Sequence, residues 1–198
     1  IAYQGLSLAY RSAPAYGAMP PQEAYPKAKE AAQKALAIDP EMSAAYVSLA
    51  SVRATFDWDF AGAETEYRRA IQISPNSSEA HFSYGNFLVA MDRSDEALIE
   101  FRNAQQIDPL SLNIQTSIAW ALYIAGRNDE AMAEIRRVIE RDPTFARGLL
   151  NFGEILQAQG KYGEAITAFR RAIELSRDPI ADMALGHALA QAGRKREA

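Results

Sequence analysis

The sequence contains no cysteine, only two histidines, and no apolar run long enough to cross a membrane. A chain without cysteine has no disulfides, thiolate metal ligands or cysteine nucleophile, and it can persist in either redox environment. The chain also has no large excess of charge of either sign, since its 21 Lys and Arg residues nearly balance its 25 Asp and Glu residues and the net charge is −4. Nucleic-acid-binding proteins are usually basic, so no nucleic-acid partner is expected. With no signal-type segment at residue 1 and no membrane span, we expect a cytoplasmic location and no membrane insertion.

What the chain does contain is an internal repeat. Prolines occupy positions 40, 75, 109 and 143, and small residues occupy positions 50, 85, 119, 153 and 186. Alanine occupies positions 28, 63, 97, 131, 165 and 198, and a large apolar residue occupies positions 67, 101, 135 and 169. The steps within each column are 33 to 35 residues. One period in four columns indicates tandem structural units.

Each unit has the apolar spacing of two helices, and no segment shows the alternation of a strand. Gly126, Gly160 and Gly193 precede the second helices, where a left-handed residue ends a helix at little cost. Asn76, with Glu79 three residues later, fits a capping box. We expect Asp178 to cap the helix after it, and Asp59 to cap another with Trp58 packed over the turn.

These columns resemble the tetratricopeptide repeat (TPR), a helix-turn-helix unit of about 34 residues. The match is carried by Tyr84-Gly85, Leu88, Ala97, Phe101, Ala104 and Pro109, and by Phe152-Gly153, Leu156, Ala165, Phe169 and Ala172. The resemblance implies an all-α fold, a right-handed α-α superhelix (TPR solenoid) of antiparallel helix pairs whose first helices line a concave face. We place a single array over 1–198, with units at 1–42 (irregular), 43–77, 78–111, 112–145 and 146–178 and a partial sixth unit at 179–198. The pattern departs from the family at an insertion over 12–25 and at one extra residue near 56–59.

The concave face is where a partner is expected to bind. Side chains that project from the first helices without belonging to a packing column are Phe82, Asn86, Val89, Thr116, Trp120, Tyr123, Leu150, Glu154, Gln157, Met183 and His187. Exposed aromatic residues along one strip favour an interface. The alternative is that Trp120 and Tyr123 fill space between neighbouring units.

Some TPR proteins hold a peptide's terminal carboxylate with a clamp of Lys, Asn and Arg side chains on this face. The corresponding positions here are Phe82, Asn86, Ser117, Arg147 and Asn151, and Phe82 stands where the clamp has a lysine. Arg147 and Asn151 are retained as candidate contacts, but a mixed apolar and polar groove for an extended or helical segment fits this sequence better.

Few residues suggest catalysis. His81 falls in a column held elsewhere by Tyr46 and Leu149, which predicts a packed ring, and Glu154 with His187 is the only titratable pair on one face. Asp57 and Asp59 are too few to ligate calcium. Arginines recur at 68–69, 136–137 and 170–171, and Glu64, Glu134 and Glu174 at helical spacing predict a solvated face of ion pairs. We therefore expect no enzyme, no metal and no cofactor.

The sequence favours a scaffold that binds a protein or peptide partner, or a domain of its own parent chain. The stretch 56–64, together with 17–26, resembles repeat arrays attached to bacterial signalling proteins, which implies a regulatory part of a larger protein. The last helix lacks its partner in the sequence, which suggests a fragment with Leu185 and Leu189 exposed. The alternative function is therefore self-association, a homodimer formed through that terminal helix.

Overall fold

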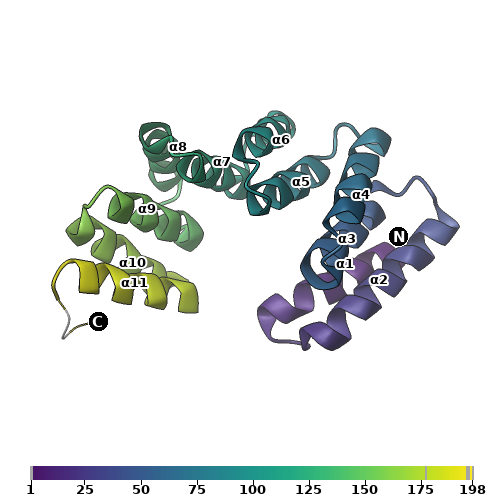
Figure 1. Ribbon diagram of the computed structural model, residues 1–198, viewed down its shortest axis with the longest axis horizontal. Coiled ribbons are helices and arrows are strands. Elements are labelled where there is room, and N and C mark those ends of the chain that lie inside the picture. Colours follow the sequence, from purple (N-terminus) through teal and green to yellow (C-terminus); the bar gives the residue numbers. More distant parts are fainter. Residues whose placement is uncertain (1, 177, 195–196, 198) are drawn as a thin grey trace. The chain divides into compact units, whose positions relative to one another are not determined.

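The computed structural model describes residues 2–176, 178–194 and 197, and every regular element in them is a helix (Figure 1). The predicted all-α fold class is confirmed. The chain forms two compact parts, each containing several repeats: Ile1–Pro109 and Leu110–Ala198. From here on, unit 1 and unit 2 denote these two parts, and the single helix pairs are called repeats. Residues 195, 196 and 198 of the predicted sixth repeat lie outside the described residues. None of the described helices has the length and apolar character needed to cross a membrane.

Each unit is a succession of helix pairs. In the described part of unit 1 the elements are α1 (Ala2–Ser12), the 3-10 turn η1 (Ala13–Tyr16), α2 (Pro21–Ile38), α3 (Ser43–Val52), the π-helical turn η2 (Arg53–Asp57), α4 (Phe60–Ile73), α5 (Ser78–Ala90) and α6 (Ser94–Ile107). In unit 2 they are α7 (Leu112–Ile124), α8 (Asn128–Arg141), α9 (Ala146–Ala158), α10 (Tyr162–Ser176) and α11 (Pro179–Gln191). Helices begin at 43, 78, 112, 146 and 179, the first residues of the predicted repeats.

Within each unit, neighbouring first helices pack on one another, and each first helix packs on its own second helix, except α11, which packs on α10 and α9. The first-helix neighbours are α1 with α3 and α3 with α5 in unit 1, and α7 with α9 and α9 with α11 in unit 2. One side of each first helix is not covered by these helix–helix contacts. We call these uncovered sides of the first helices the first-helix face of a unit.

At two positions of the repeat column that holds Gly or Ala, the residue is glycine because an aromatic ring packs against its backbone. A Cβ atom added at Gly85 would lie 2.5 Å from the ring of Phe101, and one added at Gly153 would lie 2.4 Å from the ring of Phe169. Both rings are fully buried. The same pair of columns therefore makes the same contact in both units.

Turns between the paired helices use left-handed backbone, as predicted. Gly126, Gly160 and Gly193 have φ of 74°, 74° and 77°. Asp92 holds the corresponding position in unit 1 with φ 60°. The amide of Arg127 bonds the Leu122 carbonyl at 2.9 Å, which satisfies a free carbonyl at the helix end.

The helix caps were predicted with one error. Asp178 Oδ1 accepts from the Ile180 amide at 2.9 Å, and Asp59 Oδ1 accepts from the Gly62 amide at 2.9 Å, as expected. The cap of α5 is Ser77 rather than Asn76: its hydroxyl accepts from the Ala80 amide at 3.2 Å. The serine lies directly before the first helical residue, which is where a short side chain reaches the free amides.

The extra residue near 56–59 is taken up by the π-helical turn η2, which ends at Trp58 in left-handed backbone with φ 56°. Trp58 was expected to pack over the turn, and that expectation is wrong, since its side chain is 74% exposed. Its ring contact among the described residues is edge-to-face with Phe60, with centroids 6.0 Å apart. A residue inserted into a helix must leave the helical register, and here the side chain after the insertion lies outside the packed helices.

Candidate functional site

In unit 1 the first-helix face is hollowed. A cavity of about 430 Å³ is lined by Arg11, Ser51, Ala54, Thr55, Phe60, Tyr67, Phe82, Ser83, Asn86, Phe87, Ala90 and Met91. Asn86 is exposed, whereas Phe82 and Val89 are half-buried. Phe82 and Asn86, two of the predicted partner contacts, therefore line this hollow.

Most polar side chains bordering this hollow already have partners. Arg11 donates to Ser51 Oγ at 2.8 Å, and that hydroxyl lies 3.0 Å from the Tyr67 hydroxyl. The Asn86 amide donates to the Phe82 carbonyl of its own helix at 3.0 Å. The unit 1 hollow thus offers mainly ring surface, with few free hydrogen-bonding groups.

In unit 2 the first-helix face carries an aromatic pair. The rings of Trp120 and Tyr123 on α7 lie 5.2 Å apart at 41°, and both side chains are half-buried. They pack on each other and keep part of their surface accessible. On the same face Gln157 Nε2 of α9 lies 2.9 Å from Nδ1 of the exposed His187, which links α9 to α11.

Glu154 is the unusual charge on this face. It is half-buried on α9, and within the described part of the chain it accepts no hydrogen bond and forms no ion pair. Burial raises its pKa from the usual 4.5 to about 7, and the positive charge of Arg147 opposes the rise. Near neutral pH this carboxyl is therefore poised between its neutral and charged forms.

Three predicted contact residues are not available to a partner. Thr116 is 1% exposed, and Asn151 and Leu150 are 7% and 8% exposed. A helix turns 100° per residue, so a small rotation of the helix is enough to bury a side chain at the edge of the predicted face against a neighbouring helix. Arg147 is exposed, and with the edge of Leu150 it lines a separate hollow of about 340 Å³ that also involves α10 and α11.

The predicted self-association edge is also corrected. Leu189 is 2% exposed, because α11 packs on α10 and α9, which already cover it. Leu185 is half-buried. The exposed large side chains of α11 are instead Ile180 and Met183, at its beginning.

Sequence reasoning missed Arg11, Phe60 and Tyr67 as lining residues of the unit 1 hollow. Tyr67 was assigned to a packing column, which it also fills. Arg11 lies in the irregular first repeat, where no column could be aligned. Phe60 follows the π-helical turn, where the period is broken by the extra residue.

Family models for the tetratricopeptide repeat match the chain at residues 66–99, 112–145 and 150–198. The chain belongs to the tetratricopeptide repeat family. A search of curated proteins gave no match.

Solved structures agree on the TPR fold. A Pseudomonas aeruginosa pilF structure is 22% identical with TM-score 0.77, covering 99% of this chain and 85% of that one. A thermophilic TPR protein of Thermus thermophilus is 17% identical with TM-score 0.79, covering 95% and 99%. YrrB, described as a TPR protein with an unusual peptide-binding site, is 21% identical with TM-score 0.60, covering 81% and 82%. At these identities the likeness establishes the fold alone.

The carboxylate clamp of some TPR proteins is not presented by this chain. In unit 2, Ser117 is 9% exposed and Asn151 is buried, so neither can reach a ligand. In unit 1, Asn86 is turned to its own helix backbone and Phe82 replaces the lysine. Any polypeptide bound here is held by other groups.

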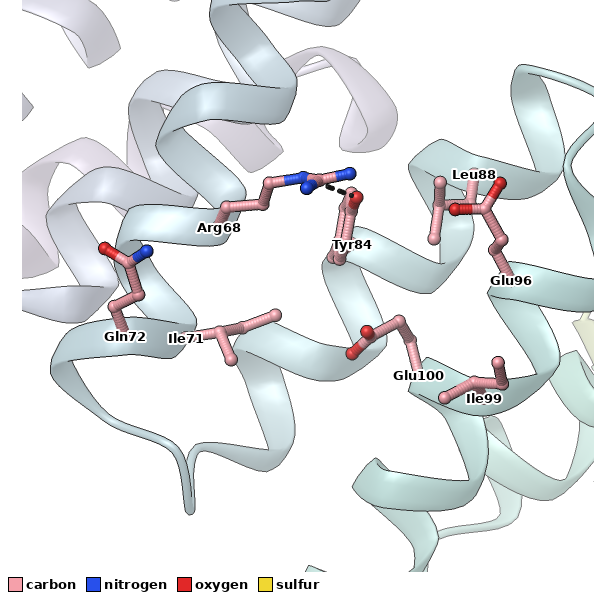
Figure 2. Close-up of a pocket in the computed structure, with 8 residues that line it drawn as sticks. All are labelled: Arg68, Ile71, Gln72, Tyr84, Leu88, Glu96, Ile99 and Glu100. Carbon is pink, nitrogen blue, oxygen red and sulfur yellow. Dashed lines mark hydrogen bonds between the residues drawn. The ribbon is translucent and has the colours of Figure 1, made fainter.

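A second hollow in unit 1, of about 370 Å³, lies between α4, α5 and α6 and is lined by Arg68, Ile71, Gln72, Tyr84, Leu88, Glu96, Ile99 and Glu100 (Figure 2). Beside it Glu64 accepts from Arg68 at 2.7 Å, from the Tyr84 hydroxyl at 2.8 Å and from Arg93 at 2.8 Å. Arg93, followed by Tyr84 and Arg68, lowers the pKa of Glu64 to about 2. This network joins α4 to α5 and to the start of α6, so its charges serve the fold.

Ion pairs also form at the two later arginine pairs, with one difference from the prediction, which paired Glu174 with Arg170. Arg137 contacts Glu134 at 3.2 Å, but Glu174 pairs with Arg171 at 2.9 Å, and Arg170 pairs with Glu197 at 3.2 Å. His81 is buried, as predicted, with Nδ1 2.5 Å from Glu100 and Nε2 2.9 Å from the Pro75 carbonyl. Among the described residues no three His, Asp or Glu side chains are grouped to hold a metal ion.

Proposed function

We propose that this TPR chain is a non-catalytic scaffold that binds a segment of another polypeptide on its first-helix faces. The observation that carries the proposal is accessible aromatic surface on or next to these faces: Phe82 in the unit 1 hollow, which Phe60 of α4 also lines, and Trp120 with Tyr123 in unit 2. Aromatic side chains of this kind contribute strongly to interfaces when a partner covers them.

The fold supports the same function. TPR proteins bind protein or peptide partners, and the similar YrrB structure is described as having a peptide-binding site. Helix pairs stacked in this way present the first helices side by side, which suits an extended or helical segment. The polar residues beside the rings, Asn86 and Gln157, can fix the register of a bound backbone.

The test is selection of ligands from a random peptide library displayed with both peptide ends blocked. We expect selected peptides to bind the intact chain, and the Trp120→Ala/Tyr123→Ala double variant to weaken binding at least tenfold, about the effect of losing one interface hot spot. Leu175→Ala, which removes an exposed apolar side chain of α10, is the matched control and should change nothing. Equal loss in the control, or no loss in the double variant, contradicts the proposal.

The wider setting that we infer is a regulatory part of a larger bacterial signalling protein in the cytoplasm. Its support is the resemblance of 56–64 and 17–26 to repeat arrays attached to such proteins; in the structure, residues 56–60 run from the end of the π-helical turn into the start of α4. Reading the coding sequence on both sides of these residues tests it. A kinase, cyclase or winged-helix domain supports this setting, and an unrelated domain contradicts it.

A further inference from the structure

Three side chains of unit 2 occupy the same place in successive first helices. Trp120 of α7, Glu154 of α9 and His187 of α11 are 34 and 33 residues apart in the chain. Because α7 contacts α9 and α9 contacts α11, these side chains follow one another across neighbouring helices. Packed helices lie about 8–10 Å apart, a gap that long side chains or one ligand side chain can span.

Glu154 stands out because no other residue that the structure describes pairs with it. Other partly covered glutamates of the chain have one, such as Glu64 with Arg93 and Glu134 with Arg137. A carboxylate that is partly removed from water without a hydrogen bond or a counter-ion is unfavourable. The cost is removed either when the carboxyl binds a proton or when a neighbouring group supplies a positive charge, and perturbed carboxyls of this kind are candidates for binding sites.

The one basic side chain known to act on Glu154 does not pair with it. Arg147 lies seven positions earlier on α9, is exposed, and lines the separate hollow shared with α10 and α11. His187 has Nδ1 turned to Gln157. On the first-helix face of unit 2, Glu154 therefore shares neighbouring helices with the Gln157–His187 pair and with the aromatic pair of α7.

The aromatic pair on α7, the helix that packs against α9, is suited to a cation. A Trp face attracts a Lys or Arg group within about 6 Å of the ring, and Trp120 is only half-buried, against Tyr123. A guanidinium is planar, so it can stack on a ring and donate hydrogen bonds to a carboxylate at the same time. One aromatic surface and one unpaired carboxylate at equivalent repeat positions match that geometry.

We propose that the first-helix face of unit 2 binds an Arg or Lys side chain of its polypeptide ligand, with Glu154 as the counter-ion and Trp120 or Tyr123 as the aromatic surface beside it. This inference rests on the proposed function and specifies its ligand class. A site of this kind selects a positively charged ligand group, whereas the carboxylate clamp of other TPR proteins selects a negatively charged one.

The experiment uses pools of nonapeptides, blocked at both ends, in which the central residue is fixed as Arg, Lys, Gln or Glu and all other positions are random. We expect the Arg and Lys pools to bind the intact chain about tenfold more tightly than the Gln pool, and the Glu pool to bind least. In Glu154→Gln the preference for a basic centre should fall below about twofold, whereas Glu140→Gln, an exposed glutamate of α8, should keep it.

The outcomes separate the two proposals. Equal binding of the Arg and Gln pools, with binding still lost in Trp120→Ala/Tyr123→Ala, overturns the basic ligand and leaves the scaffold standing. Absence of binding by every pool contradicts both. A preference for Arg that survives in Glu154→Gln also overturns the assignment.

A second readout distinguishes a binding role from a structural one. The melting temperature of free Glu154→Gln at pH 8 should rise, because an unpaired charge is removed, while its binding of the Arg pool weakens. A fall in both stability and binding means that Glu154 supports the fold, and that result overturns the proposal.

Discussion

Units 1 and 2 are built on the same packing and differ on the surface that packing leaves free. Gly85 lies against Phe101 in unit 1 as Gly153 lies against Phe169 in unit 2. On the first-helix face, however, unit 1 has a hollow in which most polar side chains are paired with one another or with the backbone, and unit 2 has Trp120 and Glu154, a carboxyl with no partner among the described residues. At repeat positions that pack against another helix, the size of the side chain is limited by the space available. At repeat positions on the first-helix face, the type of side chain can differ from one repeat to the next.

The largest expected effect tests the shared packing. Phe101→Ala and Phe169→Ala should each lower the free energy of unfolding of their own unit by ~3–5 kcal/mol, because each removes a fully buried ring. Urea unfolding followed by circular dichroism and by amide hydrogen exchange in each unit gives the two values. A loss of less than about 1 kcal/mol of unfolding free energy in either unit would contradict the claim that the two units share the same packing.

Glycines of the same column provide a sharper comparison. Gly153→Ala should cost ~1–3 kcal/mol, since the new methyl would overlap the Phe169 ring. Gly186 has no atom within 4 Å of an added Cβ, so Gly186→Ala should stabilise α11 by ~0.5–1 kcal/mol through helix propensity. Thermal unfolding of the two variants should therefore shift in opposite directions, and shifts of the same sign contradict the packing account.

The charge difference between the faces predicts a pH dependence confined to unit 2. Because burial raises the pKa of Glu154 from 4.5 to about 7, its stabilising contribution is complete below pH 4.5 and is lost as the pH rises through 7. Arg147 on α9 reduces the effect, and His187 is the titratable group that α11 brings to this face. Glu154→Gln should therefore gain ~1–2 kcal/mol over the parent at pH 8 and little at pH 4.

Equilibrium unfolding of both proteins at the two pH values measures this difference, with Glu140→Gln as the control. A difference that is larger at pH 4, or equal in the control, shows that Glu154 is not a desolvated carboxyl.

The smallest expected effect concerns the aromatic side chain that lies outside the packed helices. Trp58→Ala should change the free energy of unfolding by less than about 0.5 kcal/mol, because the side chain is exposed and its ring contact is with Phe60. Peptide binding should also be unchanged, in contrast to Trp120→Ala. Calorimetric titration with a selected peptide checks both variants, and a binding loss at Trp58 would extend the site to the π-helical turn.

The sequence was sufficient for the fold because its repeat columns are packing columns. A recurring Gly or Ala opposite a recurring large residue fixes where helices cross, and Gly126, Gly160 and Gly193 mark where they end. The candidate site was predicted less well, since Thr116, Asn151 and Leu189 are buried by small rotations that periodicity does not resolve. The pKa of Glu154 depends on how its neighbours cover it, which no spacing in the sequence records.

The most direct test of the account follows from the chain having only two tryptophans. In Trp58→Phe, fluorescence comes from Trp120 alone, and titration with the Arg-centred peptide pool should give a saturable change in emission. In Trp120→Phe, the exposed Trp58 should report no change over the same range. Saturable binding without any change at Trp120 would place the ligand elsewhere and contradict the account.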